Sequence, residues 1–369
     1  MQRRSPADIH ATPAHCAACR RSIRQGSHSF YLASILLPVS VREPAYAIYA
    51  FCRMADDLID RDGGGRAAIE TLHALLDRVY AQRPSEHFIE RSLADVVRRF
   101  AIPRAIPNAL IEGLEWDAAG RRYRSLAELE AYAARVAGTV GIMMTLVMGR
   151  RDAATLARAA DLGVAMQLTN IVRDIGEDAR AGRLFLPLDL MMAAGIDPER
   201  WLRAPQPSQA ITGLSAELLA RAEELYSRSE AGISALPRDC RTGIEAARLL
   251  YRAIGMKVAA GLDPLRERAV TTRLEKLQCL ARASAPRFRR SAGSDRHAPP
   301  LEATAFLIEA VRLHQSSPAL RALPPWWHVG ARATRMLELL DAFAARETFG
   351  QAKSGAGGGI EMHERRAGA

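Results

Sequence analysis

Two separate segments of the chain carry aspartate and arginine residues at helical spacing, and these residue types can bind a metal ion and a phosphate. In the first segment, Tyr49, Arg53, Asp56 and Asp60 follow one another at intervals of four, three and four residues. Residues three or four apart lie on the same face of an α-helix. The segment therefore predicts a helix with one polar stripe that ends in two carboxylates.

The second segment repeats this arrangement with different polar neighbours. Gln167, Asn170, Asp174 and Asp178 are spaced three, four and four residues apart, and Arg173 borders the stripe. Like charges four residues apart destabilise a helix by roughly 0.2–0.5 kcal/mol. No lysine follows on the next turn, so a compensating positive charge must come from outside the helix.

Magnesium would supply that charge. It is a hard ion that proteins hold through one or two carboxylates, water and substrate phosphates. Two facing carboxylate pairs could hold Mg²⁺ against a diphosphate, and Arg53 and Arg173 could contact its oxygens through their planar guanidinium groups. One such pair alone would be typical of a solvated surface. Two matching stripes, each with an arginine in an apolar helix, favour a functional site.

The elements that position these stripes are predicted to be helices throughout. Capping-box patterns begin at Ser40 and Ser125, and Asp152 can cap the helix that carries the second stripe. Ala and Leu dominate and runs of β-branched residues are few, which favours an all-α protein. The expected helices cover residues 40–60, 66–82, 86–100, 107–119, 125–149, 152–178, 213–235, 238–262, 270–284, 301–316 and 331–347.

The sequence suggests one helical domain with additions at both ends. We expect an N-terminal arm at 1–19, the catalytic domain at 20–285, a basic linker at 286–300, a helical C-terminal extension at 301–347 and a disordered tail at 348–369. The tail prediction depends on the glycine-rich stretch near residue 357.

Composition narrows the classes of partner. The chain has 369 residues and a net charge of +10, which suits anionic partners. No basic stripe is interleaved with aromatic residues, so we expect no nucleic acid. The longest apolar run, Val136 to Met148, is too short to span a bilayer. We expect a cytoplasmic protein in peripheral contact with the inner face of the membrane.

Five segments together resemble the squalene/phytoene synthase family, most closely its bacterial members of carotenoid biosynthesis. They run in the family's order across about residues 20–285, and the second aspartate motif is the most specific of them. The segments are Ser27-His-Ser-Phe-Tyr31, Phe51-Cys-Arg-Met-Ala-Asp-Asp-Leu-Ile-Asp60, Val136-Ala-Gly-Thr-Val-Gly141, Gln167-Leu-Thr-Asn-Ile-Val-Arg-Asp-Ile-Gly-Glu-Asp178 and Arg183-Leu-Phe-Leu-Pro187.

The resemblance implies a fold, a metal and a set of site residues. The fold would be a single-domain, isoprenoid-synthase-type helical bundle around a central cavity. The metal would be Mg²⁺, with Mn²⁺ as a substitute, and there would be no NADPH. The implied metal ligands, which are also catalytic, are Asp56, Asp60, Asp174 and Asp178. The implied cavity tyrosines are Tyr132 and Tyr251. The implied diphosphate contacts are Ser29, Arg53, Gln167, Asn170, Arg173 and Arg183.

The resemblance also implies a reaction. Two molecules of geranylgeranyl diphosphate would join head to head through a cyclopropylcarbinyl diphosphate, and a second ionisation would give 15-cis-phytoene without a reductant. Mostly small or flexible side chains at Gly138–Met148, together with Ala134, favour this longer substrate over farnesyl diphosphate.

Three alternatives stay open at this point. The first is another head-to-head synthase that makes presqualene diphosphate, squalene or dehydrosqualene from farnesyl diphosphate. The second is a chain-elongating prenyl diphosphate synthase, which also uses aspartate-rich helices. The third is a non-catalytic helical protein that binds anionic lipid through its basic surface and needs no Mg²⁺.

Overall fold

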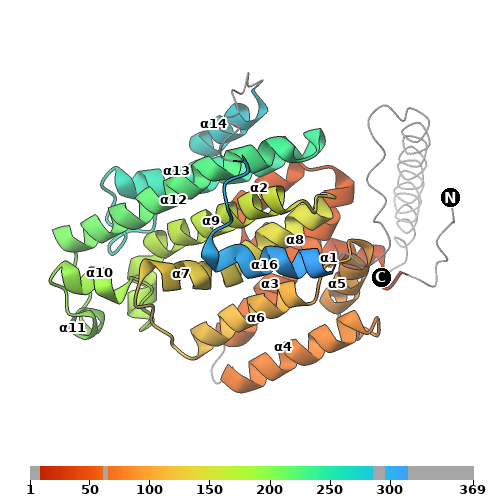
Figure 1. The fold of residues 1–369 in the computed structure, drawn as a ribbon, viewed down its shortest axis with the longest axis horizontal. Helices are drawn as coiled ribbons and strands as arrows, with labels where there is room; N and C mark the ends of the chain where they lie inside the picture. Colours follow the sequence, from red (N-terminus) through yellow and green to blue (C-terminus); the bar gives the residue numbers. More distant parts are fainter. Residues whose placement is uncertain (1–8, 61–64, 286–295, 315–369) are drawn as a thin grey trace, which may run out of the picture. The chain divides into compact units, whose positions relative to one another are not determined.

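The computed structural model describes residues 9–60, 65–285 and 296–314, and in these ranges the only regular structure is helical (Figure 1). The chain divides into two units, residues 1–320 and 321–369, and the second lies wholly outside the described residues. The helices are α1 (Pro13–Gly26), α2 (His28–Ile35), α3 (Val39–Asp60), α4 (Gly65–Tyr80), α5 (Phe88–Arg99), α6 (Ala105–Ala118), α7 (Leu126–Ala133), a π-helical turn η2 (Ala134–Gly138), α8 (Thr139–Val147), α9 (Ala153–Arg180), α10 (Leu188–Ala193), α11 (Pro198–Arg203), α12 (Gln209–Ala235), α13 (Arg238–Ala259), α14 (Arg273–Ser284) and α16 (Glu302–Leu313).

The all-α prediction is confirmed, and most predicted helices match observed ones within a few residues. The expected helix at 331–347 lies outside the described residues. Four short helices were not predicted: α1, α2, α10 and α11. In α1 only Cys19 and Ile23 are buried, so its apolar stripe is too thin to detect. The helix runs across the expected boundary between residues 19 and 20.

The helix that carries the second stripe, α9, lies at the centre of the bundle. It packs against α7, α8, η2, α12, α13 and α16. Two glycines allow the backbones to approach closely. A Cβ at Gly163 would lie 2.4 Å from the carbonyl oxygen of Ala137, and one at Gly141 would lie 2.3 Å from that of Ala159. A larger residue at either position would push α9 away from α8 and η2.

The helix that carries the first stripe, α3, packs against α1, α5, α6 and α8. Its apolar face is anchored in the core by Val41, Ile48 and Phe51, all of which are fully buried. The helix begins at Val39, so the capping box predicted at Ser40 does not start it. Pro44 lies inside the helix, where the carbonyl oxygen of Ser40 receives no hydrogen bond from residue 44. The stripe of Arg53, Asp56 and Asp60 is left on the less buried side of the helix.

The predicted helix at 125–149 is continuous, but it contains the π-helical turn η2 in its middle. Ala134 begins this turn and is fully buried in the core. It lines neither of the two large cavities described below. The use of Ala134 to argue for a longer substrate was therefore wrong, because its side chain packs in the core and lines neither cavity.

The last helix of the described residues, α16, packs against α6, α7, α8, α9 and η2 (Figure 1). The segment before it is fixed by buried charges. Arg158 on α9 donates hydrogen bonds to the carbonyl oxygens of Ala298 (3.1 Å) and Pro299 (3.2 Å), and Arg228 on α12 donates to Pro299 at 2.8 Å. The predicted division of residues 286–369 into linker, extension and tail stays a prediction, since most of it lies outside the described residues.

Asp161 neutralises both of these arginines. Its carboxylate lies 2.8 Å from the Nε of Arg158 and 2.9 Å from that of Arg228, and the side chains of Arg158 and Asp161 are fully buried. We expect Asp161→Asn to lower the free energy of unfolding by about 3 kcal/mol, because a buried guanidinium loses its counter-ion. Urea denaturation would measure this. Glu70→Gln, which removes a solvent-exposed pair with Arg66, is the control and should change little. A loss equal to the control's would contradict the prediction.

In the ranges that the structure describes, no helix is both long enough and apolar enough to cross a membrane.

Candidate functional site

One polar pocket contains every residue that the sequence and the resemblance marked as part of a site. Residues from α1, α2, α3, α6, α7, α9, α13 and α14 and from the segments between them line it. The marked residues are Ser29, Arg53, Asp56, Asp60, Tyr132, Gln167, Asn170, Arg173, Asp174, Asp178, Arg183 and Tyr251. The structure thus brings the two stripes together, while the roles of the individual residues stay predictions.

An arginine from the loop after α9 links the two stripes. The guanidinium of Arg183 lies 3.3 Å from the carboxylate of Asp60 on α3 and 3.1 Å from that of Asp178 on α9. The second carboxylates of the two stripes therefore face each other across a single positive charge.

The first carboxylate of the second stripe, Asp174, is held by two arginines. The Nε atoms of Arg173 and Arg268 each lie 2.8 Å from its Oδ1. Burial alone would raise the pKa of Asp174, but the hydrogen bonds from Arg173 and then Arg268 outweigh burial and lower it. The pKa shift therefore favours the charged form of Asp174.

The carboxylates of Asp56 and Asp178 are less well compensated. Burial, with a further contribution from Asp60, raises the pKa of Asp56. Burial also raises the pKa of Asp178 to about 6, although Arg183 opposes the shift. Arg53 lies closer to Asp57 (2.6 Å) than to Asp56 (3.6 Å). The pocket thus holds negative charge that a bound cation would stabilise.

The donor atoms suit Mg²⁺, provided that a substrate completes the coordination. Besides Asp117, the four carboxylates of the two stripes line the pocket, and the buried Oδ1 of Asn170 has no hydrogen-bond partner among the described residues. Oxygen atoms of this kind are the ligands that Mg²⁺ prefers. Within the described ranges, however, no three His, Cys, Asp or Glu side chains come close enough together to hold a metal ion. Each ion would need phosphate oxygens in addition to a carboxylate pair.

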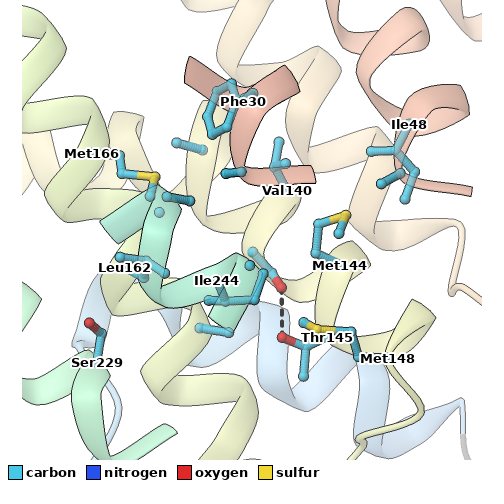
Figure 2. Close-up of a pocket in the computed structure, with 18 of the residues that line it drawn as sticks. Phe30, Ile48, Val140, Met144, Thr145, Met148, Leu162, Met166, Ser229 and Ile244 are labelled. Carbon is cyan, nitrogen blue, oxygen red and sulfur yellow. Dashed lines mark hydrogen bonds between the residues drawn. The ribbon is translucent and has the colours of Figure 1, made fainter. Parts of the chain in front are cut away.

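An apolar cavity opens from this pocket (Figure 2). The two share Phe30, Tyr49, Cys52, Gln167 and Asn170, so they are continuous. The labelled side chains in Figure 2 include Val140, Met144 and Met148 of the segment that the sequence marked as a possible wall, together with Leu162, Met166 and Ile244. Val140, Gly141, Met144, Thr145 and Met148 of the segment Gly138–Met148 line this apolar cavity, while its use for a hydrocarbon chain stays a prediction.

Three charged residues of the pocket were not found from the sequence: Asp117, Arg268 and Lys276. Asp117 is the last acidic residue of α6 and accepts a hydrogen bond of 2.6 Å from the hydroxyl of Tyr132. The ring of Tyr132 stacks on that of Phe185, with centroids 5.4 Å apart. The charged residue at helical spacing from Asp117 is Arg121, which lies beyond the end of α6, so Asp117 belongs to no stripe that the sequence could mark.

Asp117 gives the stability of the protein a specific pH dependence. Burial raises its pKa to about 7, above the value in an unfolded chain. The folded state therefore binds an extra proton between about pH 4 and pH 7, and the stability that this group contributes is lost as the pH rises through that range. Asparagine does not ionise but can still accept the hydrogen bond from Tyr132. We therefore compare the free energy of unfolding of Asp117→Asn with that of wild type at pH 4 and at pH 8. We expect the difference to shift in favour of the variant by on the order of 2 kcal/mol as the pH rises.

Urea denaturation at the two pH values measures this gain. A stability difference between the two proteins that does not change with pH would contradict the predicted shift.

Comparison with known proteins identifies the family. The family model described as squalene/phytoene synthase matches residues 23–275, which is more than half of the chain. The chain belongs to the squalene/phytoene synthase family. The matched residues include both aspartate stripes, Arg183 and Arg268.

Individual relatives agree with this membership. A phytoene synthase of Rhodobacter capsulatus is 50% identical over 270 residues, which cover 72% of this chain and 80% of the relative. A phytoene synthase of Cereibacter sphaeroides is 47% identical over 308 residues, covering 79% and 86%. A 15-cis-phytoene synthase of a Paracoccus species is 39% identical over 269 residues, covering 70% and 87%.

Solved structures of the family share the fold. A dehydrosqualene synthase in complex with a ligand superimposes with a TM-score of 0.67 at 32% identity, covering 73% of this chain and 95% of that one. A squalene synthase from Alicyclobacillus acidocaldarius gives a TM-score of 0.62 at 25% identity, covering 67% and 94%. The isoprenoid-synthase-type bundle expected from the sequence is thereby confirmed.

Proposed function

We propose that the protein is a phytoene synthase that joins two molecules of geranylgeranyl diphosphate head to head and releases diphosphate. The observation that carries the proposal is the continuity of a carboxylate- and arginine-lined pocket with an apolar cavity. One end suits a diphosphate with its cations, and the other suits a hydrocarbon chain. The phytoene synthases among the relatives support the choice of product.

The charged residues of the pocket would bind and orient the diphosphates. Arg173 and Arg268 lie together beside Asp174, and Arg183 lies between the stripes. Guanidinium groups bind phosphate oxygens in pairs, so these side chains can pass from carboxylate to substrate when cations arrive. Mg²⁺ bound by Asp56, Asp60, Asp174 and Asp178 would neutralise the leaving diphosphate. Ser29, Gln167 and Asn170 would add polar contacts at the junction with the apolar cavity.

The aromatic residues would protect and stabilise the carbocations that follow ionisation. Tyr251 is buried, and its ring centroid lies 4.9 Å from that of Phe30 at the junction of the two cavities. Tyr132 lies across the pocket among Tyr123 and Phe185. Aromatic faces attract cations, and the apolar lining excludes water that would otherwise capture them. Neither the formation of the cyclopropylcarbinyl diphosphate nor its conversion to phytoene would require NADPH.

A product assay tests the proposal. Purified full-length protein is incubated with geranylgeranyl diphosphate and Mg²⁺, without NADPH, and the extracted hydrocarbon is identified by chromatography and mass spectrometry. We expect phytoene, and we expect none when EDTA is present. When isopentenyl diphosphate is added as a co-substrate, we expect no longer prenyl diphosphate. A longer prenyl diphosphate as the product would instead identify a chain-elongating synthase.

A second candidate is the condensation of two farnesyl diphosphates to dehydrosqualene. It is favoured by the superposition on a dehydrosqualene synthase. The same assay with farnesyl diphosphate distinguishes the two, because efficient conversion of this substrate with the longer one inert would overturn the first proposal. The proposed location is the cytoplasm, in peripheral contact with the inner face of the membrane, where an apolar product dissolves.

A further inference from the structure

Four large apolar side chains are exposed in one region, at the end of α13, in the loop that follows and on α14. The exposed fractions are 55% for Met256, 62% for Val270, 65% for Leu274 and 64% for Leu277. Figure 1 shows α14 at the edge of the bundle beside α13, and among the helices described it packs mainly against α13. We refer to these four residues as the α14 patch.

Direct contacts hold the three elements of the α14 patch together. The Nζ of Lys257, next to Met256, donates a hydrogen bond of 2.7 Å to the carbonyl oxygen of Val270 and lies 2.9 Å from the carboxylate of Glu275. On α14, Cys279 is buried while Leu274 and Leu277, three residues apart, are directed to solvent. A capping box formed by Thr272 and Glu275 fixes the start of α14. The exposed apolar side chains are therefore held on an ordered helix and not on a frayed helix end.

The charges around the α14 patch are mainly positive. Arg273, Lys276 and Arg282 lie on the same helix, and none of them forms an ion pair with another described residue. The acidic residue of this helix, Glu275, is already paired with Lys257. A helix that combines exposed leucines with uncompensated basic residues is suited to the boundary between the headgroups and acyl chains of an anionic bilayer.

The α14 patch borders the polar pocket. Val270 and Lys276 also line the polar pocket, on the side where Arg268 lies. The polar pocket is in turn continuous with the apolar cavity. If the proposed function holds, the substrate is an amphiphile and the product is a hydrocarbon, so both would pass through an opening bordered by this surface.

The geometry points to the α14 patch as the surface through which the protein docks on an anionic lipid bilayer. Leucine side chains enter the headgroup region, and Arg273, Lys276 and Arg282 contact lipid phosphates. The opening of the polar pocket then faces the membrane. This inference deepens the proposed function by naming the partner at its opening, but the binding it describes does not depend on turnover.

Sedimentation with vesicles tests the docking. The full-length protein is mixed with phosphatidylcholine vesicles, with or without 30% phosphatidylglycerol, and the bound fraction is measured without substrate. We expect binding to the anionic vesicles. We expect Leu274→Glu with Leu277→Glu, and separately Arg273→Glu with Arg282→Glu, to weaken it by about tenfold or more. The matched control is Met192→Glu with Leu313→Glu, which replaces two equally exposed apolar residues on α10 and α16.

Turnover on detergent-dispersed substrate is measured for the same variants. Leu274, Leu277, Arg273 and Arg282 do not line the pocket, so we expect it to be unchanged. Absence of phytoene from every protein would refute the proposed function but leave the vesicle result standing. Equal loss of vesicle binding in the control pair would overturn the docking inference.

The same experiments distinguish a bilayer from two other partners that could cover the α14 patch, a second copy of the protein and the chain's own C-terminal segment. If a second copy covers it, the leucine variant will change the sedimentation coefficient of the protein in solution and vesicles will not bind. If the chain's own C-terminal segment covers it, vesicle binding will be absent from the full chain and will appear only in a variant that ends at residue 314. Either outcome would overturn the inference.

Discussion

Replacing Asp56 or Asp174 by asparagine is expected to lower kcat by at least about two orders of magnitude, which is typical when a group that stabilises developing charge is removed. Each aspartate is the first carboxylate of its stripe, and the two lie on different helices in one pocket. Asparagine keeps the shape and one oxygen but removes the negative charge that a metal ion requires. Single-turnover measurements with saturating Mg²⁺ would separate this loss from weaker substrate binding.

Two neighbouring acidic residues provide matched controls. Asp57 and Glu177 lie on the same two helices but do not line the pocket. We expect Asp57→Asn and Glu177→Gln to change kcat little. Calorimetric titration with inorganic diphosphate and Mg²⁺ gives a readout besides activity, and the variants of Asp56 and Asp174 should lose the binding that depends on Mg²⁺. Near-normal turnover in either of these variants would contradict the metal assignment.

The two stripes could be predicted because the spacing that defines each of them lies within one short segment of the sequence. Spacing of three and four residues is a property of any helix, and like charges at that spacing inside an apolar segment need a cause outside the helix. The compensating charges were the part that spacing did not reveal. Arg268, which holds Asp174, is separated from it by 94 residues in the chain. Only the packing of α9 against α13 and its following loop brings it there.

The predictions of the fold were likewise correct where the information is local in the sequence, and they failed where it is weak or comes from distant segments. The helix α9 was evident because a long apolar segment follows the capping residue Asp152. The helix α1 was missed because two buried residues are too few to define a face. The π-helical turn that begins at Ala134 was also missed, because an α-helical period does not predict such a turn. The buried charges of Arg158 and Asp161 likewise depend on a carbonyl-bearing segment about 140 residues later.

The choice between substrates depends on the far end of the apolar cavity, and Ala159 offers a test. Ala159 and Asn170 both line this cavity. They are eleven residues apart on α9, or roughly 16 Å at the helical rise of about 1.5 Å per residue. Asn170 lies at the junction with the diphosphate pocket, so Ala159 is placed to contact the distant part of a bound prenyl chain.

We expect Ala159→Leu to shorten the cavity and to shift the preference from geranylgeranyl to farnesyl diphosphate. The longer substrate has one more five-carbon unit, and each buried CH₂ contributes about 0.8 kcal/mol, so excluding part of that unit should lower the ratio of the two kcat/KM values by about tenfold or more. The control is Ala153→Leu, an exposed position in the first turn of the same helix. Retained conversion of farnesyl diphosphate would show that the variant is folded and that the charged pocket is intact. An unchanged ratio in that folded variant would mean that the prenyl chain does not extend along α9 as far as Ala159, and the substrate assignment would then lose its structural basis.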